Sequence, residues 1–215
     1  MRLLRLGLAL LSFCALQAQI TKLPADILPD SYSRLPLVKR ADLDDNGKPV
    51  FDRVAGASRA TAAPGPAGIS LYSPQFAEPM HVMNQYLRDT VAGRRYFELS
   101  ALVAAREFDQ QYEWTGHEAA GLRAGLDQSV IDAVKFNESV DGLPEKESTV
   151  IRIGRGLFRE HRVSPELFAK AVELFGKQGA FEISAVMGDY AMAAVILNFA
   201  DQRLPPDRKP LMPEK

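Results

Sequence analysis

Two neighbouring stretches carry the clearest structural signal: residues 95–106 read RYFELSALVAAR, and residues 111–117 read QYEWTGH. Apolar side chains in the first stretch recur at the spacing of an α-helix with a buried face, namely Tyr96, Leu99, Leu102, Val103 and Ala105. Similar spacing returns further along the chain. No segment alternates apolar and polar residues convincingly, as a half-buried strand would. We therefore expect an all-α protein.

Capping residues and glycines predict where the helices begin and end. A helical pattern starts near residue 76, and Ser164 followed by Pro165 is the clearest start signal, because serine caps a helix and proline suits its first position. Gly176 is expected to stop that helix near Phe175. Three further helices are expected, at residues 128–136, 145–160 and 181–199.

Charged residues in the two quoted stretches are candidates for proton transfer. Glu98 lies in an apolar run, where a carboxylate is costly unless it is paired; the alternative is a solvent-facing position of that helix. Glu113 and His117 are four residues apart and share one helix face. Such a carboxylate raises the pKa of histidine and orients it. The alternative is an exposed ion pair worth about 0.3–0.5 kcal/mol.

These residues can meet only if the chain reverses direction. In one straight helix, Glu98 and Glu113 would lie about 22 Å apart, at 1.5 Å per residue. A break within residues 108–111 would fold the second segment back on the first, with Asp109 as a candidate N-cap. The sequence permits this break without demanding it.

The quoted residues resemble the carboxymuconolactone decarboxylase family and the related alkylhydroperoxidase D-like proteins. In thiol members of that family, a glutamate precedes a Cys-x-x-Cys pair, and a histidine follows it. Glu98 and His117 fit the outer positions, whereas Gln110 and Glu113 replace the two cysteines. With similar strings at 161–164 and 190–198, the resemblance covers about residues 75–200. It implies an alkylhydroperoxidase D-like helical bundle with a break before Tyr112.

The resemblance implies a cofactor-independent lyase for a small lactone or carboxylic acid. The family's decarboxylases act on a lactone acid whose conjugated carbonyl accepts the electrons released with carbon dioxide. On this hypothesis His117 is the general acid, Glu113 orients it, and Glu98 handles a second proton or positions the substrate. Arg106, Tyr112 and Trp114 are candidate substrate-binding residues. Each has a structural alternative: a solvated helix end for the arginine, and core or interface packing for the aromatic residues.

Two other functions stay open. A thiol peroxidase needs a thiolate, and Cys14 is the only cysteine of the chain, so a peroxidase-related role would lack the redox pair. A non-catalytic oligomeric binding or scaffold protein is the remaining alternative. Because family members assemble as trimers or hexamers, a homo-oligomer is expected.

Charge and residue spacing argue against nucleic acid and metal ions as partners. The formal net charge is −1, without a basic patch. His81 and His161 have no metal-ligand spacing to His117. Residues 42–47 begin like a calcium loop, but Arg53 stands where a bidentate carboxylate is required. A solvated turn is expected there, and neither a cofactor nor a metal is predicted.

The N-terminus is typical of an exported protein. Arg2 and Arg5 precede an apolar run, and cleavage after Ala18 would remove residues 1–18 as a signal peptide. The mature protein would then be periplasmic or secreted, with no cysteine and no membrane span. Export argues against the lactone of aromatic catabolism as the substrate, because that pathway is expected in the cytoplasm.

The remaining sequence divides into three parts. Repeated prolines predict an irregular N-terminal arm at residues 19–74 that wraps over the helical domain or over a neighbouring subunit. The helical domain is expected at residues 75–203. A C-terminal tail follows at residues 204–215, where Pro205 and Pro206 end regular structure.

Overall fold

The computed structural model of the protein describes residues 23–213, so the expected signal peptide lies outside the described residues. Within that range the chain forms eight α-helices and no β-strand, which confirms the all-α prediction. The helices are α1 (Gly47–Phe51), α2 (Pro66–Ser70), α3 (Pro74–Arg88), α4 (Arg94–Glu107), α5 (Gln111–Arg123), α6 (Gln128–Lys135), α7 (Glu145–Arg155) and α8 (Pro165–Phe199).

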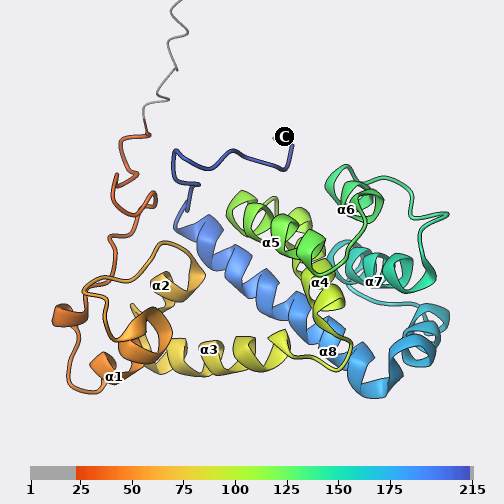
Figure 1. Ribbon diagram of the computed structural model, residues 1–215, viewed down its shortest axis with the longest axis horizontal. Coiled ribbons are helices and arrows are strands. Elements are labelled where there is room, and N and C mark those ends of the chain that lie inside the picture. The colour runs from red at the N-terminus through yellow and green to blue at the C-terminus, as the bar shows by residue number, and fades with distance from the viewer. Residues whose placement is uncertain (1–22, 214–215) are drawn as a thin grey trace, which may run out of the picture.

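Helix α4 is the centre of the helical body. Every residue from Phe97 to Ala105 is buried, so this helix is enclosed on all sides rather than on one face. It packs mainly against α5, α7 and α8. In Figure 1, α8 crosses the middle of the molecule, with α5 on one side of it and α3 on the other. The apolar run that predicted a helix therefore predicted the core as well.

Helix α8 begins as the sequence predicts and bends at the expected glycine. The Ser164 side chain accepts a hydrogen bond from the backbone N–H of Leu167. Gly176 has a φ of 70° and a ψ of 170°, which divides the element into two helical segments. By length and composition α8 could cross a membrane, but half of its most apolar stretch is buried in the protein. Its apolar residues therefore contribute to the core.

The N-terminal arm is more ordered than its prolines predicted. Besides α1 and α2 it contains a 3-10 turn at Arg40–Asp42 and a π-helical turn at Asp52–Gly56. The prediction of an irregular arm is therefore wrong for these segments, because Pro66 and Pro74 occupy first turns of helices, where a missing N–H costs nothing. The arm has its own buried cluster, formed by Val38, Val50, Phe51, Ala62 and Leu71 with Ala77 of α3.

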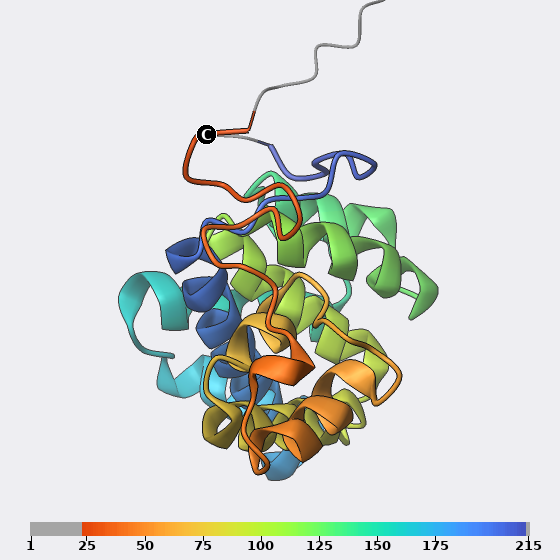
Figure 2. The same ribbon diagram turned by 90° about the vertical axis from the view of Figure 1, so that its left-hand side faces the viewer.

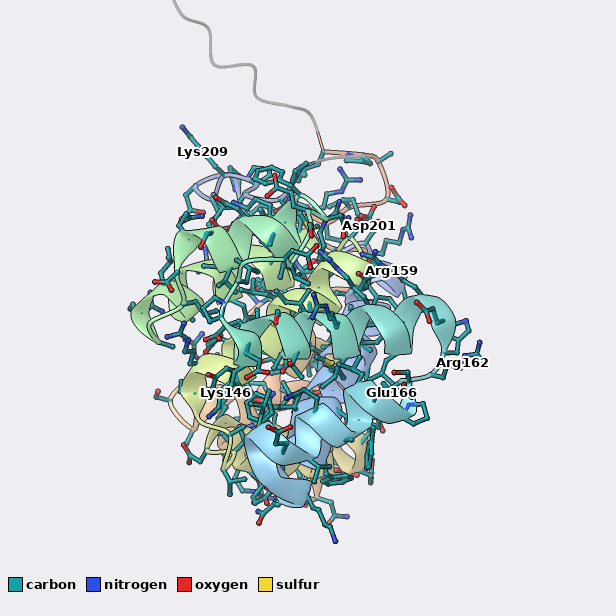
Figure 3. All side chains as sticks on the ribbon, turned by 90° about the vertical axis from the view of Figure 1, so that its right-hand side faces the viewer. Lys146, Arg159, Arg162, Glu166, Asp201 and Lys209 are labelled. Atoms are coloured by element: carbon teal, nitrogen blue, oxygen red, sulfur yellow. The ribbon has the colours of Figure 1, made fainter. Side chains whose placement is uncertain are left out.

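The arm packs along one side of the helical body (Figure 2). Its calcium-like segment is a turn, in which Asp44 Oδ1 accepts hydrogen bonds from the backbone N–H groups of Gly47 at 2.6 Å and Asn46 at 3.1 Å. The face away from the arm carries solvated charges, among them the labelled, exposed Lys146, Arg162 and Glu166 (Figure 3).

Candidate active site

The chain reversal that the site requires lies between α4 and α5. Helix α4 ends at Glu107, and Asp109 adopts a left-handed conformation with φ of 50°. Gln110 then caps α5, because its side chain accepts a hydrogen bond from Tyr112 N at 2.9 Å. The predicted break is confirmed. The predicted cap is wrong by one residue, because Asp109 makes the turn itself, a conformation that aspartate tolerates better than most residues.

His117 lies between two buried carboxylates. Its Nδ1 is 2.6 Å from Glu98 Oε2, and its Nε2 is 3.4 Å from Glu113 Oε2. Glu98 is fully buried and Glu113 is 5 % exposed, so neither is a solvent-facing helix position. Arg94 Nε donates to the other oxygen of Glu98 at 2.7 Å, which compensates the buried charge. The structure therefore brings the three predicted catalytic residues together.

The two acids favour the protonated form of His117. Burial lowers the pKa of His117, but the hydrogen bonds to Glu113 and Glu98 outweigh burial and raise this pKa above its ordinary value. Burial also favours a neutral Glu98, yet His117 and Arg94 together hold the pKa of this carboxyl below its usual range. The two acids therefore favour the protonated form of the imidazole and fix its orientation, as a proton donor requires.

A cavity of about 280 Å³ adjoins this group, near the lower end of the roughly 300–1,000 Å³ of small-molecule sites. Its walls come from five places: the arm, α3, α5, α8 and the C-terminal tail. Glu113 and His117 line it, and Arg208 of the C-terminal tail adds a cation. The volume suits a small organic molecule.

The arm completes the cavity through a close contact with Tyr112. The hydroxyl of Tyr112 donates to the carbonyl oxygen of Pro64 at 2.8 Å. Next to it, Gly65 has a φ of 112°, and a Cβ atom at this position would lie 2.9 Å from Tyr112 Oη. Only glycine combines this backbone conformation with so close an approach. Of the three predicted substrate-binding residues, Tyr112 is the one that lines the cavity.

Arg106 and Trp114 do not line the cavity, which corrects their predicted substrate-binding role. Arg106 Nε donates to the carbonyl oxygen of Lys135 at 2.8 Å, and its guanidinium pairs with Asp109. Trp114 is fully buried and its indole N–H donates to Glu118. Both stabilise the packing of α4, α5 and α6 rather than contact a ligand.

Three polar residues around the cavity keep a buried atom without a partner. Within the described residues, no group hydrogen-bonds Glu113 Oε1, Asp189 Oδ1 or Tyr190 Oη. Leaving such an atom unsatisfied costs roughly 1–3 kcal/mol, and folded proteins rarely do so. All three residues line the cavity, so polar side chains contribute to its wall.

Residues of α3 and α8 were missed by the sequence analysis. Asp189 and Tyr190 of α8, together with His81, Asn84 and Arg88 of α3, line the cavity. An acid in the most apolar helix was the signal for Asp189, and it is the same signal that singled out Glu98. Tyr190 belonged to a string noted only for its family resemblance.

Two aromatic rings, from α4 and α8, pack near the imidazole of His117 and restrict its position. The ring of Tyr190 meets His117 edge-on at 4.6 Å between centroids, and Phe97 packs against Tyr190 at 5.6 Å. His81 also lines the cavity, but residues 23–213 contain no group of three side chains able to hold a metal ion.

Compared with known proteins, the chain matches no family model and no curated protein sequence. What the site does must therefore be inferred from its own residues. They provide an oriented imidazole with one acid on each side of it, and a small cavity whose wall includes polar side chains.

Proposed function

We propose that this protein is a cofactor-independent lyase that acts on a small lactone or carboxylic acid, with His117 as the general acid. One observation carries the proposal: the imidazole of His117 is held between Glu98 and Glu113 at the wall of a cavity of about 280 Å³. The resemblance of residues 95–117 to the carboxymuconolactone decarboxylase family, with its alkylhydroperoxidase D-like bundle, supports the same chemistry.

The reaction needs little from the protein beyond placement and one proton. A carboxylate moved from water into a partly apolar cavity loses the hydration that stabilises it, which favours loss of carbon dioxide. Arg88 and Arg208 line the cavity and supply the positive charge that attracts an acid. His117 then delivers its proton to the carbon from which carbon dioxide has departed, a step that positioned acids accelerate about 10²–10⁴-fold.

Glu98 and Glu113 have different parts in this proposal. Glu98 is paired on both oxygens, by Arg94 and by His117, and so holds the imidazole in place. Glu113 has one oxygen near His117 Nε2 and the other oxygen without a partner in the described residues. Glu113 Oε2, the oxygen beside Nε2, is the atom placed to return a proton to the imidazole.

A thiol peroxidase is disfavoured on chemical grounds. The positions that correspond to the two thiols hold Gln110 and Glu113, and Cys14 is the only cysteine in the sequence. Gln110 is also engaged in structure, because its Nε2 donates to Asn198 Oδ1 at 2.7 Å. Neither position supplies a nucleophile that attacks a peroxide.

A non-catalytic binding protein is the second candidate. The unpartnered polar atoms around the cavity favour ligand binding whether or not a reaction follows. Soaking crystals with small acids and lactones separates the two candidates when it is combined with turnover measurements. Ligand density beside His117 without product formation favours binding alone.

Export and self-association are part of the proposal. Removal of residues 1–18 would leave a periplasmic or secreted protein, and intact-mass measurement of the secreted chain tests this. Large apolar side chains on α3 and α8, including Tyr86 at 59 % and Phe199 at 76 % exposure, support a homo-oligomer. Light scattering gives the number of subunits, for which a trimer or hexamer is expected.

The test of the catalytic proposal is His117→Gln. Carbon dioxide release from a panel of small lactone acids and keto acids is expected to fall about 10²–10⁴-fold, because the proton donor is lost. His161→Gln is the matched control, since His161 is exposed and lies outside the cavity. Unchanged turnover in His117→Gln removes this residue from the mechanism, and absence of turnover in the parent protein overturns the lyase proposal.

A further inference from the structure

The described part of the C-terminal tail, residues 204–213, is fastened to the rest of the protein at both of its ends. Just before it, Gln202 Nε2 donates to the carbonyl oxygen of Ser31 at 2.9 Å, and Gln202 Oε1 accepts from Gly65 N at 3.3 Å. At its far end Met212 is 4 % exposed and belongs to the hydrophobic core. The residues between these points, 206–211, are exposed. The tail therefore crosses the surface as a strap with two fixed ends.

One side chain of α5 holds the far end of the tail. Gln111 Oε1 accepts hydrogen bonds from the backbone N–H groups of Met212 at 2.9 Å and Leu211 at 3.0 Å. Gln111 Nε2 donates to the carbonyl oxygen of Met212 at 2.8 Å. All three bonds are to the main chain, so they fix the path of the tail. Because the next residue, Tyr112, lines the cavity, this clamp holds the tail beside the cavity.

Arg208 lies in the middle of the strap and lines the cavity although it is an exposed residue. A residue that is both exposed and part of the wall lies where the cavity meets solvent. Its charge acts on Tyr112: burial raises the pKa of the tyrosine hydroxyl, and Arg208 opposes this rise. The side chain of His117, by contrast, is only 13 % exposed. Arg208 therefore marks the outer end of the cavity and His117 its inner end.

Of the two arginines in the cavity wall, Arg208 is the one whose guanidinium is available to a ligand. Arg88 Nε donates to Asn84 Oδ1 at 2.8 Å, and its guanidinium lies over the ring of Phe97 at 5.4 Å. The side chain of Arg208 makes no hydrogen bond or ion pair with any part of residues 23–213. An arginine fork without a protein carboxylate matches the carboxylate of a ligand, to which it donates two parallel hydrogen bonds.

We propose that Arg208 binds the anionic group of a small organic acid at the outer end of the cavity, and that Gln111 is the positioning residue that holds the tail so that Arg208 reaches this group. The tail lies outside the stretch that resembles a known family, about residues 75–200, so the resemblance does not imply this role. Such a contact orients the acid as well as attracting it, whether or not a reaction follows.

The test compares benzoate with benzamide, a neutral molecule of nearly the same shape, by isothermal titration calorimetry. The cavity of about 280 Å³ has apolar wall residues to contact the phenyl ring, among them Val54, Ala77 and Met80. Arg208→Gln is expected to raise the Kd of benzoate about tenfold, as for a hydrogen bond to a charged group, and to leave that of benzamide unchanged. Lys209→Gln is the matched control, because it removes the same charge from a side chain that lies outside the cavity and projects from the surface (Figure 3).

Gln111→Leu tests the positioning role, because it removes the three hydrogen bonds to the tail. The Kd of benzoate should rise by a factor of roughly three to ten, while that of benzamide stays the same. Combined with Arg208→Gln, it should cost less than the sum of the two separate losses, since both changes remove one contact. Equal losses for benzoate and benzamide, or no loss for either, overturn the positioning role.

Three results overturn the role of Arg208. The parent protein binds benzoate no more tightly than benzamide, or Arg208→Gln leaves the affinity for benzoate unchanged, or Lys209→Gln weakens benzoate equally, as attraction by net charge would. Failure of the lyase proposal is distinguishable, because benzoate would still respond to Arg208→Gln while no acid is decarboxylated. If only the role of Arg208 fails, Arg208→Gln decarboxylates acids with an unchanged KM, and turnover still depends on His117.

Discussion

Two buried acids on α8, Glu182 and Asp189, have opposite surroundings although they lie two turns apart. Glu182 is 1 % exposed and accepts four hydrogen bonds, from Thr90 Oγ1, Val91 N, Tyr86 Oη and Gln178 Nε2. Asp189 is 4 % exposed and accepts one, from Asn84, while within residues 23–213 its other oxygen has no partner. The two acids are therefore almost equally buried, but they differ greatly in how many hydrogen bonds they accept.

The consequence is visible in their acidities. Burial raises the pKa of both groups, but the four donors outweigh burial at Glu182 and lower its pKa from 4.5 to about 2. At Asp189 burial is the larger effect, and the pKa rises. Glu182 is thus an anion that ties α8 to the end of α3 and the residues after it, whereas Asp189 is left incomplete at a cavity. The number of hydrogen bonds that a buried acid accepts, rather than its burial, separates a structural acid from a candidate functional one.

The largest effect on stability is expected from Glu182→Ala. This change leaves buried donors, Thr90 among them, without an acceptor, and should lower the free energy of unfolding by roughly 3 kcal/mol. Urea denaturation measures the loss. Glu173→Ala on the exposed surface of the same helix is the control and should change stability by less than about 1 kcal/mol. Equal losses in the two variants would show that the four hydrogen bonds do not stabilise the fold.

Amide substitutions at the two acids should change the stability of the protein to different extents. Glu182→Gln places an amide N–H₂ against existing donors and should cost about 1–3 kcal/mol of unfolding free energy. Asp189→Asn keeps the acceptor for Asn84 and places the amide where no protein donor stands, so stability should stay within about 0.5 kcal/mol of the parent. Melting temperatures of the two variants measured side by side decide the matter. A greater loss of stability in Asp189→Asn than in Glu182→Gln would contradict the interpretation of Glu182 as the structural acid.

The contributions of Glu182 and Asp189 to stability should change in opposite directions as the pH falls. The pKa of Glu182 is depressed, so its contribution to stability is present above pH 4.5 and is lost as the pH falls towards about 2. The pKa of Asp189 is raised above 3.8, so its contribution is present below that pH and is lost as the pH rises through the folded-state pKa. Urea midpoints recorded from pH 2 to 6 should rise less steeply in Glu182→Gln and more steeply in Asp189→Asn than in the parent. Parallel profiles would contradict both assignments.

The smallest effect is expected on the alkaline side, from His117. Its pKa is raised above 6.5, so the stability that its charge contributes is present below that pH and is lost as the pH rises through the folded-state value. Glu98→Gln should lower the pKa of His117, because one of its two carboxylate partners becomes neutral. Nuclear magnetic resonance titration of the imidazole measures this shift. An unchanged pKa of His117 would show that Glu98 does not stabilise the protonated imidazole.

Much of the helical body was predictable because its signals are local. The spacing within residues 95–106, the Ser164 cap and the break at Gly176 each involve residues a few positions apart. The grouping of Glu98, Glu113 and His117 was predictable only on condition that the chain reversed, and the turn at Asp109 supplies that reversal. The short helices of the arm were not foreseen, because five-residue helices carry too little periodicity to detect.

Residue type and near-neighbour spacing were enough to predict the longer helices, the acids and imidazole available for proton transfer, and the absence of a thiol pair. Whether each buried acid has its hydrogen bonds satisfied depends on residues that are far apart in the chain. Glu182 takes its hydrogen bond from Thr90 across 92 positions, and Asp189 reaches Asn84 across 105. In the sequence both are simply acids in an apolar helix. Donors from distant parts of the chain satisfy Glu182, whereas among residues 23–213 no donor reaches Oδ1 of Asp189.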